Sequence, residues 1–188
     1  MNTAMSGKTF TPRARRRALA VMASFGLWGF YSTFFILDWY KAWPLVFFYT
    51  LLVLNTYFSV RTFASITPHE HLGQRCMDAL LGIWLLLAPL SFNTPIYFVL
   101  VTTALFITAT IKYIFLAPIV GFSRLLYMKI RIDALGILLC SLALLGVLAG
   151  YAYYATAVWS FIFFMANIYV LWWEPHYHLH LHYDESFL

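Results

Sequence analysis

Residues 95–116 read PIYFVLVTTALFITATIKYIFL, and this stretch decides the class of protein to which the chain belongs. Its single charged residue is Lys112. A helix needs about 20 predominantly apolar residues to cross the hydrocarbon core of a bilayer, which is about 30 Å thick. The stretch therefore predicts a transmembrane helix, because a surface helix of a soluble protein has a polar face.

Five more apolar runs occur along the chain, at residues 18–37, 42–60, 77–93, 133–152 and 155–173. Of the 188 residues, 63% are hydrophobic and 10% are charged, whereas a soluble domain is about 45–50% apolar. We therefore predict an all-α polytopic integral membrane protein with six transmembrane helices arranged as three hairpins. The predicted transmembrane domain covers residues 18–173, between a basic N-terminal tail (1–17) and a His-rich C-terminal tail (174–188).

The positions of the Lys and Arg side chains predict the orientation in the membrane. If the N-terminus lies inside, the outer loops contain only Lys41 of the 12 Lys and Arg residues. An excess of cations on the cytoplasmic side is the usual pattern in such proteins. We expect both termini to be cytoplasmic and the protein to lie in a bacterial inner membrane. The net charge of +5 is then explained by topology and by contact with anionic lipids, so no nucleic-acid partner is expected.

The first apolar run follows the basic sequence RARRR of residues 13–17, as the apolar region of a signal peptide follows its basic region. The run is longer than usual and no clear cleavage site precedes Asp38, so we expect an uncleaved signal anchor. A mitochondrial presequence is the alternative, since residues 1–37 contain no acidic residue.

Two of the runs open with related sequences. Residues 77–83 read MDALLGI and residues 132–137 read IDALGI, and their acids, Asp78 and Asp133, are 55 positions apart (133 − 78). This repeat favours three hairpins that each enter the membrane from the cytoplasm. We expect both acids to lie at or near the first turn of their helices, where the helix dipole and free N–H groups favour a carboxylate.

The stretch DALLGIWLLLAPL, residues 78–90, resembles the SPW-repeat family of small bacterial membrane proteins. In that family an apolar Gly-Leu-Trp run leads to a Ser-Pro-Trp, for which this chain has Ala88-Pro89-Leu90. The resemblance implies a membrane hairpin and no defined activity.

Polar residues inside the predicted spans are few. We expect Asn55 and Asn167 to form hydrogen bonds between helices. No predicted span centre carries an ionisable residue, and Lys112 lies close enough to the inner end for its side chain to reach the interface. Because a proton relay or a carrier of charged substrates needs such a residue in the membrane, the sequence argues against both functions.

Small residues and cysteines give two further structural predictions. Close helix contact is expected at the small residues of the fifth run, Gly136, Ala143, Gly146 and Gly150. Cys76 and Cys140 are far apart and form no CxxC pair, so we expect small apolar side chains rather than a disulfide.

All six histidines fall in two clusters, one between the second and third runs and one at alternate positions of the tail: His69, His71, His176, His178, His180 and His182. Neutral imidazole is a common ligand of transition metals. Histidines at spacing two share one face of a strand, and those at spacing four share one face of a helix. We therefore predict that these six residues bind a divalent transition metal: zinc, nickel, copper or iron. The alternative is a solvated tail that binds no physiological metal.

Three functions fit these observations. The first, favoured by the shortage of charge in the spans, is a small non-enzymatic membrane protein. It acts as a structural or accessory component of a membrane complex and forms homo- or hetero-oligomers through helix packing. The second is a metal-ion handling or transport protein that uses the cytoplasmic His-rich tail. The third is a membrane-bound metalloenzyme with His ligands at the cytoplasmic surface, which the lack of an HxxHH motif disfavours.

Overall fold

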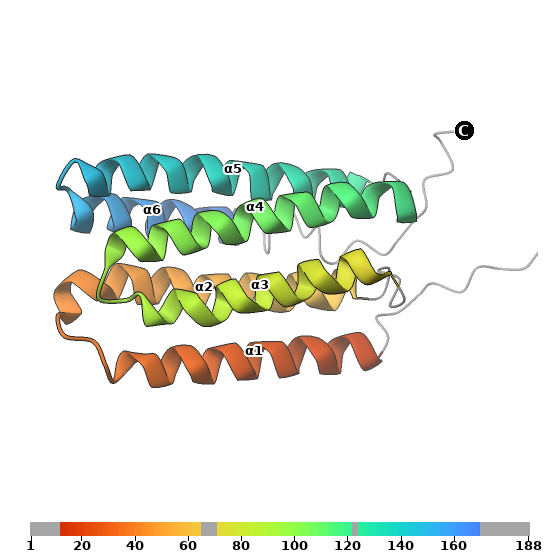
Figure 1. The fold of residues 1–188 in the computed structure, drawn as a ribbon, viewed down its shortest axis with the longest axis horizontal. Helices are drawn as coiled ribbons and strands as arrows, with labels where there is room; N and C mark the ends of the chain where they lie inside the picture. The colour runs from red at the N-terminus through yellow and green to blue at the C-terminus, as the bar shows by residue number, and fades with distance from the viewer. Residues whose placement is uncertain (1–11, 65–70, 122–123, 170–188) are drawn as a thin grey trace, which may run out of the picture.

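The computed structural model describes residues 12–64, 71–121 and 124–169, and all regular secondary structure in these ranges is helical. The helices run back and forth along a common axis, so that each is antiparallel to the one before it (Figure 1). They are α1 (Pro12–Thr33), α2 (Trp39–Phe63), α3 (Leu72–Leu90), α4 (Pro95–Val120), α5 (Arg124–Leu148) and α6 (Ala152–Ile168). The prediction of an all-α fold is confirmed.

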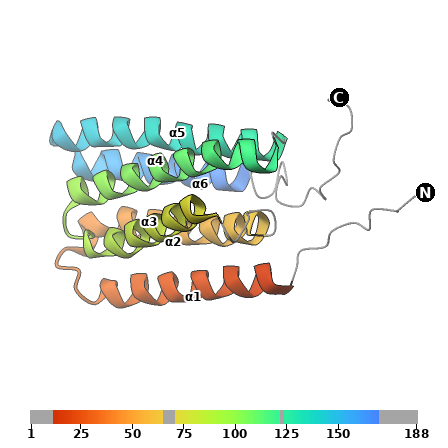
Figure 2. The same cartoon turned by 45° about the vertical axis from the view of Figure 1, so that its right-hand side comes forward.

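Contacts between neighbouring helices build a single bundle. α4 packs against α3 and α5, and α2 packs against α1 and α6. α5 and α6 also contact each other, and α1 touches α3. α1 therefore lies at one edge of the bundle, as both ribbon views show (Figure 1, Figure 2).

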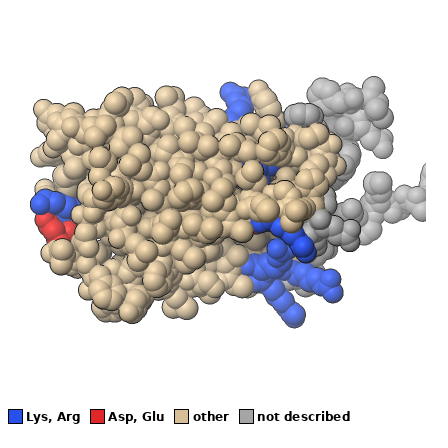
Figure 3. Space-filling model, in the orientation of Figure 1, with Lys and Arg blue, Asp and Glu red and all other residues tan. Residues whose placement is uncertain are grey.

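The two ends of the bundle differ in their chain connections and in their charge. At one end, which we call the loop end, residues 34–38, 91–94 and 149–151 connect successive helices. α1, α3 and α5 all begin at the opposite end, where Lys and Arg side chains gather on the visible surface, and we call this the basic end (Figure 3). The loop end carries Lys41, whose Nζ lies 3.0 Å from the carboxylate of Asp38.

Three of the helices, α2, α4 and α5, are long and apolar enough to cross a membrane by length and composition. α6 is apolar but shorter, with 17 residues in the described range. α1 and α3 do not meet the same condition, since α1 opens with the RARRR sequence and α3 includes Gln74, Arg75 and Asp78. The prediction of a membrane protein is thus confirmed to the extent of three helices suited to a bilayer.

Of the six helices, α4 begins at Pro95 as its apolar run predicts, and the other five begin earlier than their runs. α1 starts at Pro12 rather than at residue 18, α3 at Leu72 rather than at 77, and α5 at Arg124 rather than at 133. Arg, Lys and Gln are good helix formers, so a helix continues through residues that a hydropathy pattern places beyond its end. Charged residues that the hydropathy pattern places outside the predicted spans therefore lie within the helices.

Near the loop end, four aromatic side chains join α2, α4 and α6, and we call them the aromatic core: Phe48, Phe98, Trp159 and Phe163. The ring of Phe48 stacks on Trp159 and Phe163 with centroid separations of 3.7 and 4.4 Å. Phe98 meets Phe48 edge to face at 6.0 Å. Each such pair contributes about 0.5–1.5 kcal/mol beyond the burial of its surface, so this region is a strong source of stability.

The predicted hydrogen bond between Asn55 and Asn167 is confirmed. The Nδ2 group of Asn55 in α2 donates a hydrogen bond to Oδ1 of Asn167 in α6 at 3.1 Å. Both cysteines are free thiols; Cys140 is buried, as expected of a small apolar side chain, whereas Cys76 is exposed and departs from that expectation. The asparagine pair therefore ties α2 to α6, as interhelical amide bonds do in membrane proteins.

The glycines of α5 behave in two ways. A Cβ atom at Gly136 would lie 2.7 Å from the ring of Phe106, and one at Gly146 would lie 2.6 Å from Cβ of Ala155. Both glycines therefore permit the close helix contact that was predicted. Gly150 departs from the prediction, because it follows α5 in the turn before α6 and has a φ of +90°, which favours glycine.

Candidate functional site

A cavity of about 480 Å³ lies in the basic half of the bundle, between α1, α2, α3, α4 and α5. Its deeper part is lined by apolar side chains, which include Phe25, Leu52, Leu85 and Leu105. The part nearer the basic end is lined by polar and charged side chains, which include Gln74, Arg75, Asp78, Lys112, Lys129 and Asp133. Along α2 the lining extends from Leu52 to Phe63, about 17 Å at 1.5 Å per residue. The volume is within the range of small-molecule sites, about 300–1,000 Å³.

The first ion pair in this cavity joins α3 to α4. Nζ of Lys112 lies 2.5 Å from Oδ1 of Asp78. The Lys112 side chain is only 10% exposed, whereas that of Asp78 is 47% exposed. Gln74, one turn before Asp78, donates through Nε2 to the carbonyl oxygen of Lys112 at 3.4 Å. The antiparallel packing of α3 and α4 thus holds a lysine ammonium inside the bundle.

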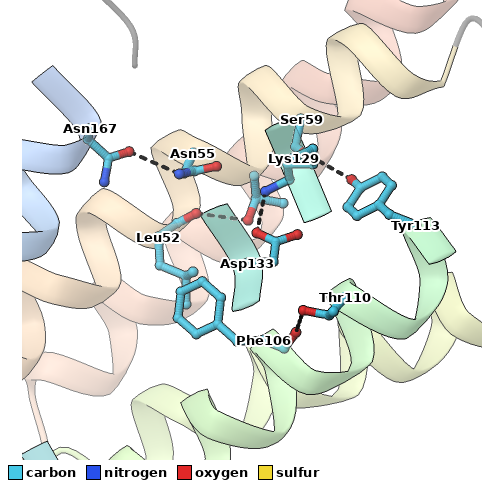
Figure 4. A network of polar contacts seen from close by, with 10 residues as sticks. Leu52, Asn55, Ser59, Phe106, Thr110, Tyr113, Lys129, Asp133 and Asn167 are labelled. Carbon is cyan, nitrogen blue, oxygen red and sulfur yellow. Dashed lines mark hydrogen bonds and ion pairs between the residues drawn. The ribbon is translucent and has the colours of Figure 1, made fainter. Parts of the chain in front are cut away.

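The second ion pair lies within α5. Nζ of Lys129 is 2.7 Å from Oδ1 of Asp133, one helical turn further along (Figure 4). Both side chains are buried, at 9% and 2% exposure. A lysine that precedes its acid by four residues is the weaker order for stabilising a helix. Local helix stability is therefore a poor reason for this pair.

One tyrosine lies beside both lysines. The Nζ atoms of Lys112 and Lys129 are 5.3 and 5.6 Å from the ring centroid of Tyr113, within the range of a cation–π interaction. The hydroxyl of Tyr113 is hydrogen-bonded to that of Ser59 in α2 at 2.8 Å (Figure 4). Tyr113 thereby connects the ion pairs of three helices to α2.

Two buried acceptor atoms in the lining accept no hydrogen bond from the described part of the chain. They are Oδ2 of Asp133 and Oε1 of Gln74. Both residues are 1% exposed and both line the cavity. A buried acceptor without a donor costs about 1–3 kcal/mol, and a charged one costs more. These atoms are therefore suited to a donor from a molecule that enters the cavity.

The placement of these charges corrects two expectations. Asp78 and Asp133 are not first-turn acids, since neither α3 nor α5 has an acid in its first turn. Each lies three residues from the midpoint of its helix (81 − 78 and 136 − 133), about 4.5 Å along the axis. The expectation that no predicted span centre carries an ionisable residue took no account of these helix bounds, which place both acids well inside their helices. Two signals in the sequence were available, the repeated acid and the spacing of four between Lys129 and Asp133.

The predicted metal ligands are placed only in part. His71 is exposed and immediately precedes α3. The other five lie outside the described residues: His69, His176, His178, His180 and His182. Within the described ranges no group of three or more His, Cys, Asp or Glu residues is placed to hold a metal ion. The metal site therefore stays a prediction.

No family model matches this chain, and no match was found among curated proteins or solved structures. The likeness of residues 78–90 to the SPW-repeat family thus stays a prediction.

Proposed function

We propose that this chain is a six-span protein of a bacterial inner membrane, with both termini in the cytoplasm, and that it binds a small ligand in the cavity near its basic end. The role is non-enzymatic: the protein holds the ligand, as a carrier or as an accessory subunit of a membrane complex, and does not transform it.

The arrangement as three hairpins, α1/α2, α3/α4 and α5/α6, is supported by exposed apolar side chains on helices other than α2, α4 and α5. α1 exposes Leu27 and Phe30, and α6 exposes Phe161, each more than half accessible. Exposed apolar side chains of this size indicate a surface that contacts lipid or another protein. The concentration of Lys and Arg at the basic end supports a cytoplasmic location for that end (Figure 3).

The observation that carries the binding proposal is the set of buried charges around the cavity. Lys112, Lys129 and Asp133 are all at most 8% exposed. An ionisable residue inside a membrane-spanning bundle costs about 2.5–3.5 kcal/mol on insertion scales, and it usually marks a ligand or ion path. A bundle that served packing alone gains more from apolar side chains at these positions.

Cysteine labelling tests this proposal. In a Cys76→Ser background, Thr56→Cys introduces a thiol into the cavity lining, and Leu54→Cys introduces one on the outer surface of the same helix. Trp43→Cys places a third near the loop end. A charged, membrane-impermeant thiol reagent is then added to inside-out and to right-side-out vesicles.

We expect Thr56→Cys to react in inside-out vesicles only, Trp43→Cys in right-side-out vesicles only, and Leu54→Cys in neither. An unreactive Thr56→Cys variant contradicts a cavity that opens to the cytoplasm. Reaction of Thr56→Cys from the outside alone contradicts the orientation.

A metal-handling role is a second candidate, which one observation favours. His71 lies at the basic end, and α6 ends at Ile168 on the same side of the bundle (Figure 1). The last described helix thus ends on the side of the bundle that carries His71. Calorimetric titration of zinc, nickel, copper and iron into the intact protein and into a variant ending at residue 175 tests this role, and bears equally on the metalloenzyme alternative. Truncation is expected to remove most of the affinity, and binding is expected to be stronger above about pH 6.5, where imidazole is neutral. If the intact protein binds none of zinc, nickel, copper and iron in this titration, both metal functions are contradicted.

A further inference from the structure

We propose that the cavity binds a single-chain amphiphile whose head group is acidic and also donates a hydrogen bond, such as a phosphate monoester. This inference rests on the proposed function and names its ligand. The head group lies among the charged side chains near the basic end, and the chain lies in the apolar part.

The net charge of the residues that line the cavity predicts an acidic head group. The lining contains three cations, Lys112, Lys129 and Arg75, and two acids, Asp78 and Asp133, so it is net positive even before Arg17 is counted. Low-polarity walls strengthen such a field, because little solvent screens it. An anion is therefore attracted, whereas a cationic head group meets two ammonium groups beside Tyr113.

The buried acceptors predict the hydrogen-bond donor. Oδ2 of Asp133 and Oε1 of Gln74 need an N–H or O–H group. A phosphate monoester that carries one proton has both a negative charge and a P–OH donor, and its second pKa is about 6. A sulfate monoester has the same shape and charge but no donor. The two head groups therefore separate the requirement for charge from the requirement for a donor.

The apolar part of the cavity predicts the hydrocarbon chain. Phe25, Leu52, Leu85 and Leu105 line its deeper end, away from the charged residues. Lipid tails are as apolar as leucine, so the chain gains little when it leaves the bilayer for the cavity. Discrimination between ligands must therefore come from the head group, which calls for probes with one common chain.

The test uses the full-length protein in nanodiscs of neutral phospholipid at about pH 5.5, where a phosphate monoester is mostly the monoanion. Radiolabelled decyl phosphate is the probe, and decyl sulfate, 1-decanol, decyltrimethylammonium and inorganic phosphate are the competitors. Decyl sulfate is expected to bind about tenfold more weakly than decyl phosphate, the effect of one charge-assisted hydrogen bond. We expect decanol to bind more weakly still, and decyltrimethylammonium and millimolar inorganic phosphate not to compete.

Matched lysine variants locate the site. Lys112→Gln and Lys41→Gln each break one Lys–Asp ion pair, the first in the cavity and the second at the loop end. Lys112→Gln is expected to weaken decyl phosphate binding at least tenfold, and Lys41→Gln to leave it unchanged. Arg75→Gln, an exposed change at the cavity, is expected to weaken binding several-fold and serves if Lys112→Gln does not fold.

Four equal decyl probes show partition into the bilayer and overturn the inference, as does strongest binding of the trimethylammonium probe. Full competition by inorganic phosphate contradicts the requirement for a hydrocarbon chain and shows that the cavity binds free phosphate instead. Failure of the Thr56→Cys labelling overturns the proposed function itself. If that labelling succeeds and the probe series fails, only the ligand class is wrong.

Discussion

The aromatic core and the charged cavity lie along the same helices but have opposite properties. Toward the loop end, α2 contributes Phe48, which is fully buried in a stack of rings. About two to three turns further on, the same helix contributes Thr56 and Ser59 to the cavity, which holds two ion pairs. One end is closely packed, and the other keeps space and charge.

The difference indicates that the aromatic core contributes to the stability of the fold, whereas the charged cavity does not. Apolar packing stabilises the fold, whereas a buried ion pair often contributes no more to stability than apolar residues of the same volume. A region that keeps such pairs, together with unpaired acceptors, is the region expected to bind something. In many proteins the functional site is likewise less favourable for stability than the rest of the fold.

Removal of an aromatic ring from the core has the largest expected effect. Phe48→Ala is expected to lower the free energy of unfolding by about 3–5 kcal/mol, because it removes buried area and leaves a hole in the stack. Phe34→Ala, at a side chain that is 71% exposed, is the control and is expected to change little. Unfolding in mixed micelles with increasing SDS measures both. Equal losses for the two variants contradict a core at the loop end.

Two glycine-to-alanine changes compare packing in the two regions directly. Gly146→Ala sets a Cβ 2.6 Å from Ala155 and is expected to cost about 1–3 kcal/mol. Gly82 lines the cavity, and a Cβ there meets only Phe25 at 3.8 Å. Gly82→Ala is therefore expected to stabilise by about 0.5–1 kcal/mol, through helix propensity. The same SDS titration measures both variants. Destabilisation by Gly82→Ala contradicts an open cavity beside Gly82.

The asparagine pair joins Asn55, in the cavity lining, to α6 and has a smaller expected effect. Asn55→Ala removes a hydrogen bond to Asn167 that is worth about 0.6 kcal/mol, the average for such bonds in membrane helices. The double change with Asn167→Ala is expected to cost less than the sum of the two single changes. Strict additivity in this double-mutant cycle argues that the two amides are not coupled.

The smallest expected effect is at the loop end, where Asp38 precedes α2. The hydrogen bond from the Lys41 side chain lowers the pKa of Asp38, and its carboxylate also accepts from the Lys41 backbone N–H. The contribution of this carboxylate to stability is thus present above the unfolded pKa of 3.8 and is lost as the pH falls through the folded value. The melting temperatures of wild type and Asp38→Asn should therefore converge below that pH. A difference that widens in acid contradicts the assigned sign.

Much of the fold follows from the sequence, because lipid imposes simple rules on length and polarity. Each of the six apolar runs overlaps a helix, and the bond between Asn55 and Asn167 was expected. The cavity was not expected, because a hydropathy pattern treats any charge as the end of a span. The pair of Lys112 with Asp78 joins residues 34 positions apart, and only the packing of α3 on α4 reveals it. The pair of Lys129 with Asp133 can be predicted from their spacing of four residues once this stretch is known to be helical.

The thermal unfolding midpoint of Lys129→Met/Asp133→Leu in nanodiscs, measured with and without decyl phosphate, tests most directly whether the buried charges serve the ligand. Without the probe, we expect a midpoint at or above that of wild type, because apolar residues of similar volume replace a buried pair at no loss. We expect the probe to raise the wild-type midpoint and to leave that of the double variant unchanged. A double variant that melts well below wild type, yet is still stabilised by decyl phosphate, would show that the ion pair serves the fold rather than the ligand.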